Sequence, residues 1–359
     1  MKKILILANN DVGLYNFRKE LIEKLLEEGY EVVISLPYGD KVDKLIELGC
    51  KYIKTDISRR GTNPVTDFLL FVKYIGMLKK EKPDFVLSYT IKPNVYGGIS
   101  CELCRVPYIA NITGLGTAVT NVGALQKFTL TLYKFALKRV EHVFFQNKQN
   151  LDFFISKEIV KDRYTLLPGS GVNLKRFSTL EYPDEKTTEF VFIARIMKAK
   201  GIDHYLEAAK YIRAKYPDTV FHVCGYCEEG HKNVLHKLHL DGTIVYHGNV
   251  DDVSEIFKTT HCMVNPSYHE GMSNVLLEAS ASGRPCLCSD IAGCREIVED
   301  GKTGFVFEPQ STESLIEALE KFISTPLEEK KHMGIEARKH VEKFFDRNIV
   351  IDEYMNKIF

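Results

Sequence analysis

Near its carboxyl-terminal third the chain contains the stretch PSYHEGMSNVLLE, residues 266–278. The mostly apolar residues 262–265 before it predict the end of a buried strand, and residues 275–277 predict the packed face of a helix. A strand, a tight turn and a helix in this order are the repeating unit of a parallel α/β fold. Glu270 is therefore expected in the loop, and Glu278 about two turns into the helix.

This turn has the features of a nucleotide-sugar site. The first amides of a helix lack intrahelical partners, and the helix dipole adds positive potential there, so the turn suits a phosphate. Carboxylates beside it do not attract phosphate but accept hydrogen bonds from hydroxyl groups on either side of it. The alternative is that Glu270 is a solvated loop residue and Glu278 an ordinary helix carboxylate.

Strand-like and helix-like segments alternate along the whole chain, which predicts βαβ units and parallel sheets. Two Rossmann-like domains follow, with a cleft between them and ligands at the carboxyl ends of the strands. We expect an amino-terminal domain over 1–172, a second domain over 173–341, and a carboxyl-terminal helix over 342–359 that returns to the first domain. The predicted strands are 4–8, 31–36, 84–88, 108–112, 142–146, 190–194, 220–224, 243–246, 262–265 and 286–289.

Residues 192–203, FIARIMKAKGID, predict a buried strand, a basic loop and a helix start. Arg195 and Lys200 would stand at the carboxyl edge of the sheet, where two cations neutralise a leaving diphosphate. Residues 289–298 and 300–306 are two further motifs, and with 192–203 and 266–278 they form an ordered set. From about Phe190 to Pro309 the chain resembles the carboxyl-terminal domain of retaining family-4 glycosyltransferases, which have the GT-B fold.

The resemblance implies roles for individual residues. Glu270 would contact the donor sugar, Glu278 would hold the ribose hydroxyls, and Arg195 and Lys200 would stabilise the departing nucleotide diphosphate, which makes Glu270, Arg195 and Lys200 the candidate catalytic residues. Gly13, at the first strand-to-helix turn, is expected to let a diphosphate or acceptor approach. The donor-binding candidates are Gly13, Gly225, Val250, Gly271, Met272, Ser273, Asn274 and Glu278. Plain tight turns are the alternative for Gly13, Gly225 and Val250.

Three segments of the first domain, 58–64, 89–98 and 112–117, follow predicted strands and are expected to gather at the cleft edge. They resemble the subset of these enzymes that builds capsule, O-antigen or glycan repeat units on polyprenyl diphosphate, including N-acetylgalactosaminyltransferases. Many relatives carry a histidine after the fourth strand, and none stands here, so the acceptor-side catalytic role is open among Thr90, Lys92 and Asn94. The acceptor-binding candidates are Arg59, Arg60, Thr90, Lys92, Asn94, Gly114 and Gly116.

Composition excludes several other classes of protein. Lys plus Arg equals Asp plus Glu at 48 each, which does not favour nucleic-acid binding. Nine scattered cysteines indicate a reducing cytosol rather than a disulfide framework, and small buried residues are a better account of Cys101/Cys104 and Cys224/Cys227 than zinc half-sites. The start of the chain predicts a strand, not a signal peptide. Gly114 and Gly116 lack the third glycine of a dinucleotide fingerprint.

The resemblance implies a retaining, metal-independent glycosyltransferase that uses a nucleotide-sugar, with a UDP-sugar as the expected donor, and extends a lipid-linked bacterial glycan. No metal site or other cofactor is expected. No segment has the roughly 18 apolar residues that a membrane span needs. Residues 68–80 and 125–139 combine apolar and basic side chains and are expected to lie on an anionic membrane surface, unless both are helices packed on the first sheet. The alternatives are a nucleotide-sugar epimerase, a transferase with a soluble acceptor, a glycan phosphorylase and a non-catalytic scaffold.

Overall fold

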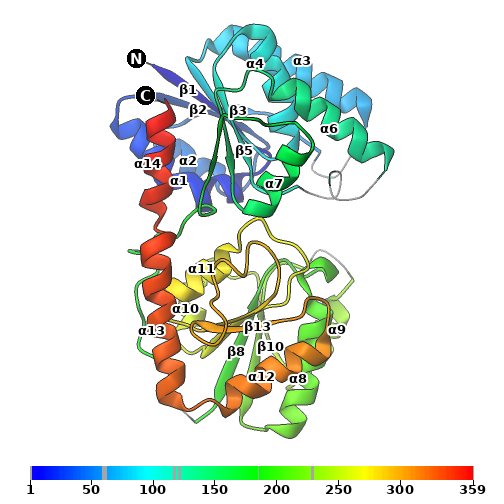
Figure 1. The fold of residues 1–359 in the computed structure, drawn as a ribbon, viewed down its shortest axis with the longest axis vertical. Helices are drawn as coiled ribbons and strands as arrows, with labels where there is room; N and C mark the ends of the chain where they lie inside the picture. The colour runs from blue at the N-terminus through cyan, green and yellow to red at the C-terminus, as the bar shows by residue number, and fades with distance from the viewer. Residues whose placement is uncertain are drawn as a thin grey trace. The chain divides into compact units, whose positions relative to one another are not determined.

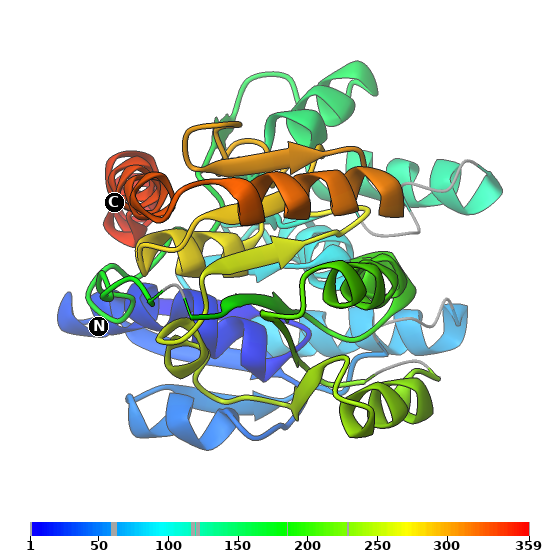
Figure 2. The same ribbon diagram turned by 90° about the horizontal axis from the view of Figure 1, so that it is seen from below.

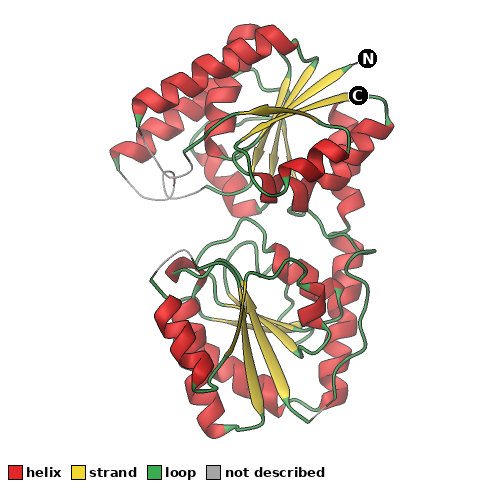
Figure 3. Ribbon diagram, turned by 180° about the vertical axis from the view of Figure 1, so that it is seen from behind, coloured by secondary structure: helices red, strands yellow, loops and turns green. Residues whose placement is uncertain are grey.

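The computed structural model describes residues 2–58, 63–115, 119, 123–184, 186–227 and 230–358. The chain divides into two compact units, one of Met1–Ser170 with Asn348–Phe359 and one of Gly171–Arg347. Each unit is a parallel sheet between two layers of helices, as Figure 3 shows. The predicted α/β class, the two Rossmann-like units and the return of the chain's end to the first unit are confirmed.

The described strands of unit 1 form a seven-stranded sheet in the order β3-β2-β1-β4-β5-β6-β7. All of its neighbouring strands are parallel. The strand order reverses between β1 and β4, and in open α/β sheets ligands bind outside the carboxyl ends of strands at such a point. The strands are β1 Lys3–Leu7, β2 Glu31–Leu36, β3 Lys51–Lys54, β4 Phe85–Tyr89, β5 Tyr108–Ile112, β6 His142–Phe145 and β7 Tyr164–Leu166.

Helices cover both faces of this sheet. Helices α1, α2 and α14 pack on one face through a core that includes Leu21 and Tyr354, and α3, α4, α6 and α7 pack on the other through Tyr74 and Phe154 (Figure 1). Their bounds are α1 Asp11–Glu27, α2 Val42–Glu47, α3 Pro64–Glu81, the π-helix η1 Pro93–Gly97, α4 Gly98–Cys104, α6 Ala124–Ala136, α7 Lys148–Ser156 and α14 Arg347–Ile358.

Unit 2 repeats this plan with a six-stranded sheet, β10-β9-β8-β11-β12-β13, whose order reverses between β8 and β11. Helices α8, α9 and α12 lie on one face, and α11 and α13 on the other (Figure 2). The strands are β8 Thr188–Ile193, β9 Thr219–Cys224, β10 Val245–Gly248, β11 Cys262–Asn265, β12 Cys286–Ser289 and β13 Gly304–Phe307. The helices are η2 Lys198–Lys200, α8 Ile202–Lys215, α9 Lys232–Leu240, α10 Ser254–Phe257, α11 Asn274–Ala281, α12 Thr312–Ser324 and α13 Leu327–Phe344.

The sequence missed the edge strands β3 and β7 and the short strand β13. Strands β3 and β7 lie at the two edges of the first sheet, and their residues are only partly buried, so they lack the continuous apolar run of a central parallel strand. The chain's end is also not one helix over 342–359, because α13 ends at Phe344 and α14 begins at Arg347.

Helix α14 is held on unit 1 by buried aromatic and polar contacts. Tyr354 packs against Phe144 with 4.6 Å between ring centroids, and its hydroxyl donates a hydrogen bond to Asn111 Oδ1. The Arg18 guanidinium of α1 lies 5.0 Å from the ring of Tyr89 and 6.0 Å from that of Tyr354. Within the described ranges, no helix is both long enough and apolar enough to cross a bilayer.

Candidate functional site

In unit 2, the turns that follow β8 and β11 meet at the point where the strand order reverses. Lys200 ends the turn after β8, and Glu270 lies in the loop after β11. Lys200 Nζ and Glu270 Oε1 are 2.5 Å apart, and the two side chains are 18% and 15% exposed. Ser267 Oγ donates a second hydrogen bond of 2.8 Å to the same carboxylate oxygen. The structure thus pairs a cation and a carboxylate that the sequence placed at separate turns.

Close backbone contacts hold the two turns together. Tyr268 N donates to Ala199 O at 3.0 Å. Gly201 has a φ of +73°, and a Cβ there would lie 2.0 Å from Pro266 O, so only glycine fits. Glycine at this position is therefore a requirement of the site, although sequence reasoning did not include Gly201 among the candidates.

The side chain of Tyr268 adds a further tie. Its hydroxyl lies 3.0 Å from His204 Nε2, and His204 Nδ1 lies 2.7 Å from Thr312 Oγ1. These contacts anchor the loop that carries Glu270 to helices α8 and α12. The sequence offered no signal for this network, because its members lie far apart along the chain.

The turn that opens α11 is clamped to the loop after β12. Ser273 N donates to Gly293 O at 2.8 Å, and Ser273 Oγ accepts from Asn265 Nδ2 at 2.6 Å. Gly293 has a φ of +83°, and a Cβ there would lie 2.7 Å from Gly271 O. The Ser273 amide and one acceptor position of its hydroxyl are thus used within the protein, and its predicted contact with a donor stays a prediction.

Polar atoms that lack a partner among the described residues lie at the same sheet edge. Asn274 Oδ1 and Ser289 Oγ are buried and make no hydrogen bond within the described part of the chain. Buried polar atoms in folded proteins are normally satisfied, so these two are suited to a polar ligand. Met272, in contrast, points into the hydrophobic core, so any contact it makes with a ligand must come from its backbone.

Glu278 lies in α11 among charged side chains. Burial is the main cause that raises the pKa of its carboxyl to about 7, while Arg176 and Arg347 oppose the rise and Asp252 adds to it. Arg176 in turn pairs with Asp252 at 3.4 Å. Sequence reasoning missed Arg176, because a single basic residue in a charged, strand-poor segment carries no local signal.

The remaining donor-side candidates of unit 2 lie at strand ends. Arg195 is exposed in the loop after β8. Gly225 directly follows β9 with a φ of +143°, and a Cβ there would lie 1.8 Å from Ala194 O, so the close approach of the segments after β8 and β9 requires this glycine. Val250 follows β10 and is partly buried against the core.

In unit 1, Gly13 and the segment after β4 follow the two strands at which the order reverses. Gly13 N donates to Asn10 Oδ1 at 2.6 Å in the first turn of α1. Thr90 adopts a φ of +74°. Lys92 Nζ pairs with Asp67 Oδ1 at 2.5 Å. Asn94 is buried and bonded to Ser88 and Asn111 O, an interior position that favours a structural role.

Three acceptor candidates, Arg59, Arg60 and Gly116, lie outside the described residues. Gly114 is partly buried in the loop after β5, with open space where a Cβ would stand. Their contacts with a ligand, like those of the other candidates, stay predictions.

The described residues contain no group of three or more His, Cys, Asp or Glu side chains arranged to hold a metal ion.

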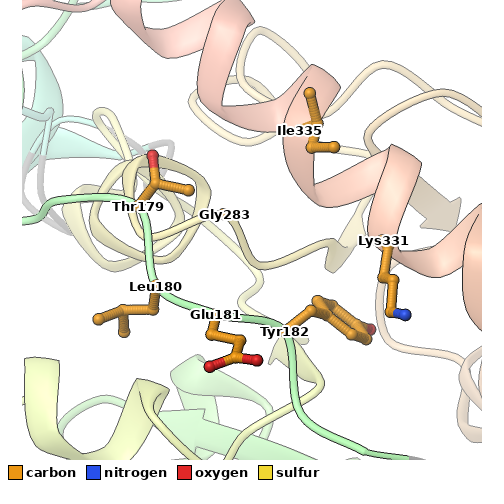
Figure 4. Close-up of a pocket in the computed structure, with 7 residues that line it drawn as sticks. All are labelled: Thr179, Leu180, Glu181, Tyr182, Gly283, Lys331 and Ile335. Atoms are coloured by element: carbon orange, nitrogen blue, oxygen red, sulfur yellow. The ribbon is translucent and has the colours of Figure 1, made fainter.

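A separate hollow of about 320 Å³ lies elsewhere in unit 2 (Figure 4). Lys331 and Ile335 of α13 face the extended segment 179–182 across it, and Gly283 completes the lining. Gly283 precedes β12, so the hollow lies towards the amino-terminal edge of the sheet. It is therefore distinct from the carboxyl edge that carries Lys200 and Glu270.

Comparison with known proteins identifies relatives of both units. Residues 3–147 match the family described as glycosyl transferase 4-like, and residues 176–340 match glycosyl transferases group 1. The chain is 26% identical to the N,N'-diacetylbacillosaminyl-diphospho-undecaprenol alpha-1,3-N-acetylgalactosaminyltransferase of Campylobacter jejuni, over 98% of this chain and 97% of the relative. It is 27% identical to an Escherichia coli UDP-Gal:alpha-D-GlcNAc-diphosphoundecaprenol alpha-1,3-galactosyltransferase, over 83% of each.

Solved structures share the fold at lower identity. Anabaena HepE in complex with UDP and glucose superposes with a TM-score of 0.81 at 15% identity, covering 100% of this chain and 99% of that one. A glycosyltransferase from Rickettsia africae superposes with a TM-score of 0.79 at 18% identity, covering 99% and 97%.

The pKa of Glu278 predicts a pH-dependent effect on stability. The pKa of Glu278 is about 7 in the folded protein and 4.5 ordinarily, so the folded state gives up this proton less readily than the unfolded state. The free energy of unfolding therefore falls as the pH rises from about 4.5 to about 7. Glu278→Gln removes this cost. We expect the variant to be more stable than the wild type by about 3 kcal/mol at about pH 8, with a much smaller difference at about pH 5.

Thermal unfolding at both pH values measures this effect, with the exposed Glu328→Gln as the control. A stability difference that is the same at both pH values would contradict the raised pKa.

Proposed function

Because this chain belongs to the group 1 glycosyl transferases and has an amino-terminal glycosyl transferase 4-like domain, we propose that it is a sugar-transferring enzyme. The proposed reaction moves a hexose or N-acetylhexosamine from a UDP-sugar to a saccharide linked to polyprenyl diphosphate. The Lys200–Glu270 pair at the reversal of strand order is the observation that carries the proposal. The names of the two relatives, matched over 98% and 83% of this chain, support the diphosphate-linked acceptor, and the UDP complex of the structural neighbour supports the donor.

The reaction that we propose retains the anomeric configuration. The bond between the sugar C1 and the phosphate oxygen breaks, and a bond from C1 to the acceptor oxygen forms on the same face. The acceptor proton passes to the departing phosphate oxygen. Lys200 and Arg195 neutralise the negative charge that develops on the departing diphosphate. Positive side chains stabilise such charge most effectively when they are already in position before the reaction. No metal ion is needed for this step.

In the proposed mechanism, the donor exchanges partners with the protein. Without a ligand, Glu270 Oε1 accepts bonds from both Lys200 and Ser267. When the diphosphate arrives, Lys200 turns to the phosphate, and Glu270 accepts hydroxyl groups of the sugar. Glu278, with Arg176 and Arg347 nearby, lies where ribose hydroxyls are held in the proposed complex.

Product analysis tests the proposed function. The purified protein is incubated with UDP-galactose, UDP-glucose or their N-acetylamino forms, together with N-acetylglucosaminyl- or bacillosaminyl-diphospho-undecaprenol. We expect one sugar to be added with the α configuration, equally with and without a chelator. A change in the nucleotide-sugar without any acceptor would identify an epimerase, and a lack of any transfer would point to a scaffold.

Loss of the cation at the donor site is expected to lower turnover. We predict that Lys200→Ala lowers kcat by about two to three orders of magnitude, because a charge-stabilising donor acts mainly in the transition state. Glu270→Gln should also lower kcat strongly. Steady-state kinetics measure both, and Lys198→Ala, an exposed lysine of the same turn, is the matched control. Wild-type turnover of Lys200→Ala would remove Lys200 from the site.

We also propose that the enzyme lies peripherally on the inner face of the cytoplasmic membrane, through segments 68–80 and 125–139. Exposed apolar side chains support this: Phe68 of α3 is 63% exposed, and Phe128 and Phe135 of α6 are 59% and 63% exposed. Lysines lie among them in both segments, which suits anionic lipid headgroups.

Vesicle flotation tests the membrane contact. Inserting a phenylalanine side chain into lipid contributes about 1.5–3 kcal/mol, so Phe68→Ser or Phe128→Ser should lower binding to phosphatidylglycerol-containing vesicles about tenfold or more. Binding should also weaken at high salt. Tyr211→Ser, at an exposed aromatic residue of unit 2, is the control. Equal binding of all variants would contradict this surface.

A further inference from the structure

Several energetically unfavourable features coincide at the carboxyl end of β4. Thr90 has a φ of +74°, which is an outlier for a β-branched residue. Its Oγ1 atom is buried and makes no hydrogen bond to any described residue. The segment continues into the π-helix η1, a rare form that frequently occurs at functional sites. Strain of this kind persists where function requires the geometry.

Lys92, which lies between Thr90 and η1, is neutralised by the nearly buried carboxylate of Asp67. Lys92 and Asp67 are only 15% and 13% exposed, and Nζ and Oδ1 are 2.5 Å apart. Tyr96 donates its hydroxyl hydrogen bond to the other oxygen, Asp67 Oδ2, at 3.0 Å. Asp67 stands in the first turn of α3, where the helix dipole favours negative charge. The amino end of α3 and Lys92 together thus hold one anionic group in the ligand-free protein.

An exposed apolar surface begins in the same part of α3. Val65, Phe68 and Leu69 are each at least 60% exposed, and they flank Asp67 along the helix. A charged pair and an apolar surface therefore lie within about one helical turn of each other. This combination matches a molecule with a charged diphosphate joined to a hydrocarbon chain.

We propose that Lys92 and the amino end of α3 bind the diphosphate–prenyl junction of the acceptor, and that Asp67 holds Lys92 until the diphosphate displaces it. This inference rests on the proposed function. The diphosphate takes the place of the Asp67 carboxylate opposite Lys92, and Val65, Phe68 and Leu69 line the start of the prenyl chain. Asp67 is a positioning residue that keeps the buried ammonium group paired in the absence of acceptor.

Geranyl diphosphate is a suitable probe, titrated by calorimetry into enzyme saturated with UDP so that the donor site is occupied. We expect Lys92→Gln to weaken its binding about tenfold to a hundredfold, the range for a charge-assisted hydrogen bond. Asp67→Asn removes the competing carboxylate and should tighten binding severalfold. Lys92→Gln should leave the binding of geraniol, which has no phosphate, unchanged.

The double variant Asp67→Asn with Lys92→Gln separates binding from structure, because it removes both charges together and leaves no unpaired ion. If Lys92 contacts the diphosphate, the double variant binds as weakly as Lys92→Gln. If the pair is only structural, the double variant recovers wild-type affinity, which would overturn the proposal. Absence of any geranyl diphosphate binding to the wild type would overturn it as well.

Lys51→Gln is the matched control. Lys51 Nζ pairs with Glu81 Oε2 at 2.6 Å at the other end of the same helix, and Lys51 begins β3, so it lies at the amino edge of the sheet. Its loss should not change probe binding. Sugar transfer is measured separately, so a protein that transfers sugar but binds the probe independently of Lys92 contradicts this inference and leaves the proposed function intact.

Discussion

The ion pair of Lys200 and Glu270 is the interaction on which the candidate site depends. Its two members come from turns after different strands, and a distance of 2.5 Å requires the turns to approach each other at the backbone. Gly201 permits that approach towards Pro266, and Gly293 permits the equivalent approach towards Gly271. Side chains at these glycines would separate the turns, so the geometry of the charges follows from backbone packing.

Each unit has a similar ion pair beside the reversal of strand order, although the two pairs follow strands on opposite sides of it, since β8 is the counterpart of β1 and not of β4. In each sheet, a lysine follows a strand at the reversal of strand order, β4 in unit 1 and β8 in unit 2, and each lysine is paired with a carboxylate from another segment. In the proposed complexes, the carboxylate of each pair neutralises a largely buried cation until an anionic ligand replaces it. The net charge of zero conceals this local organisation, since the cations that matter are balanced at short range.

Helix α3 connects the polar and apolar parts of the proposed acceptor site. Its inner face packs on the sheet through Leu70, Tyr74 and Met77, while Phe68 and Leu69 remain exposed. A helix that only covered a sheet would present polar residues outwards. The additional apolar surface beside Asp67 suits the amphiphilic substrate that we propose. The packing of α3 confirms the structural alternative for segment 68–80, while its contact with a membrane stays a proposal.

Local sequence determined the fold class, the central strands and the turn that opens α11, because periodicity and helix-start signals extend over only a few neighbouring residues. It also placed Glu270 and Lys200 at strand ends. Only the tertiary structure decided which charges meet, because Lys200 and Glu270 are 70 residues apart, and Lys92 and Asp67 are 25 apart. The edge strands β3 and β7, the interior position of Asn94 and the raised pKa of Glu278 likewise depend on neighbours distant in sequence. Which side chains form ion pairs, and how deeply each is buried, depends on the packing of the whole chain, so a short pattern of residues cannot predict either.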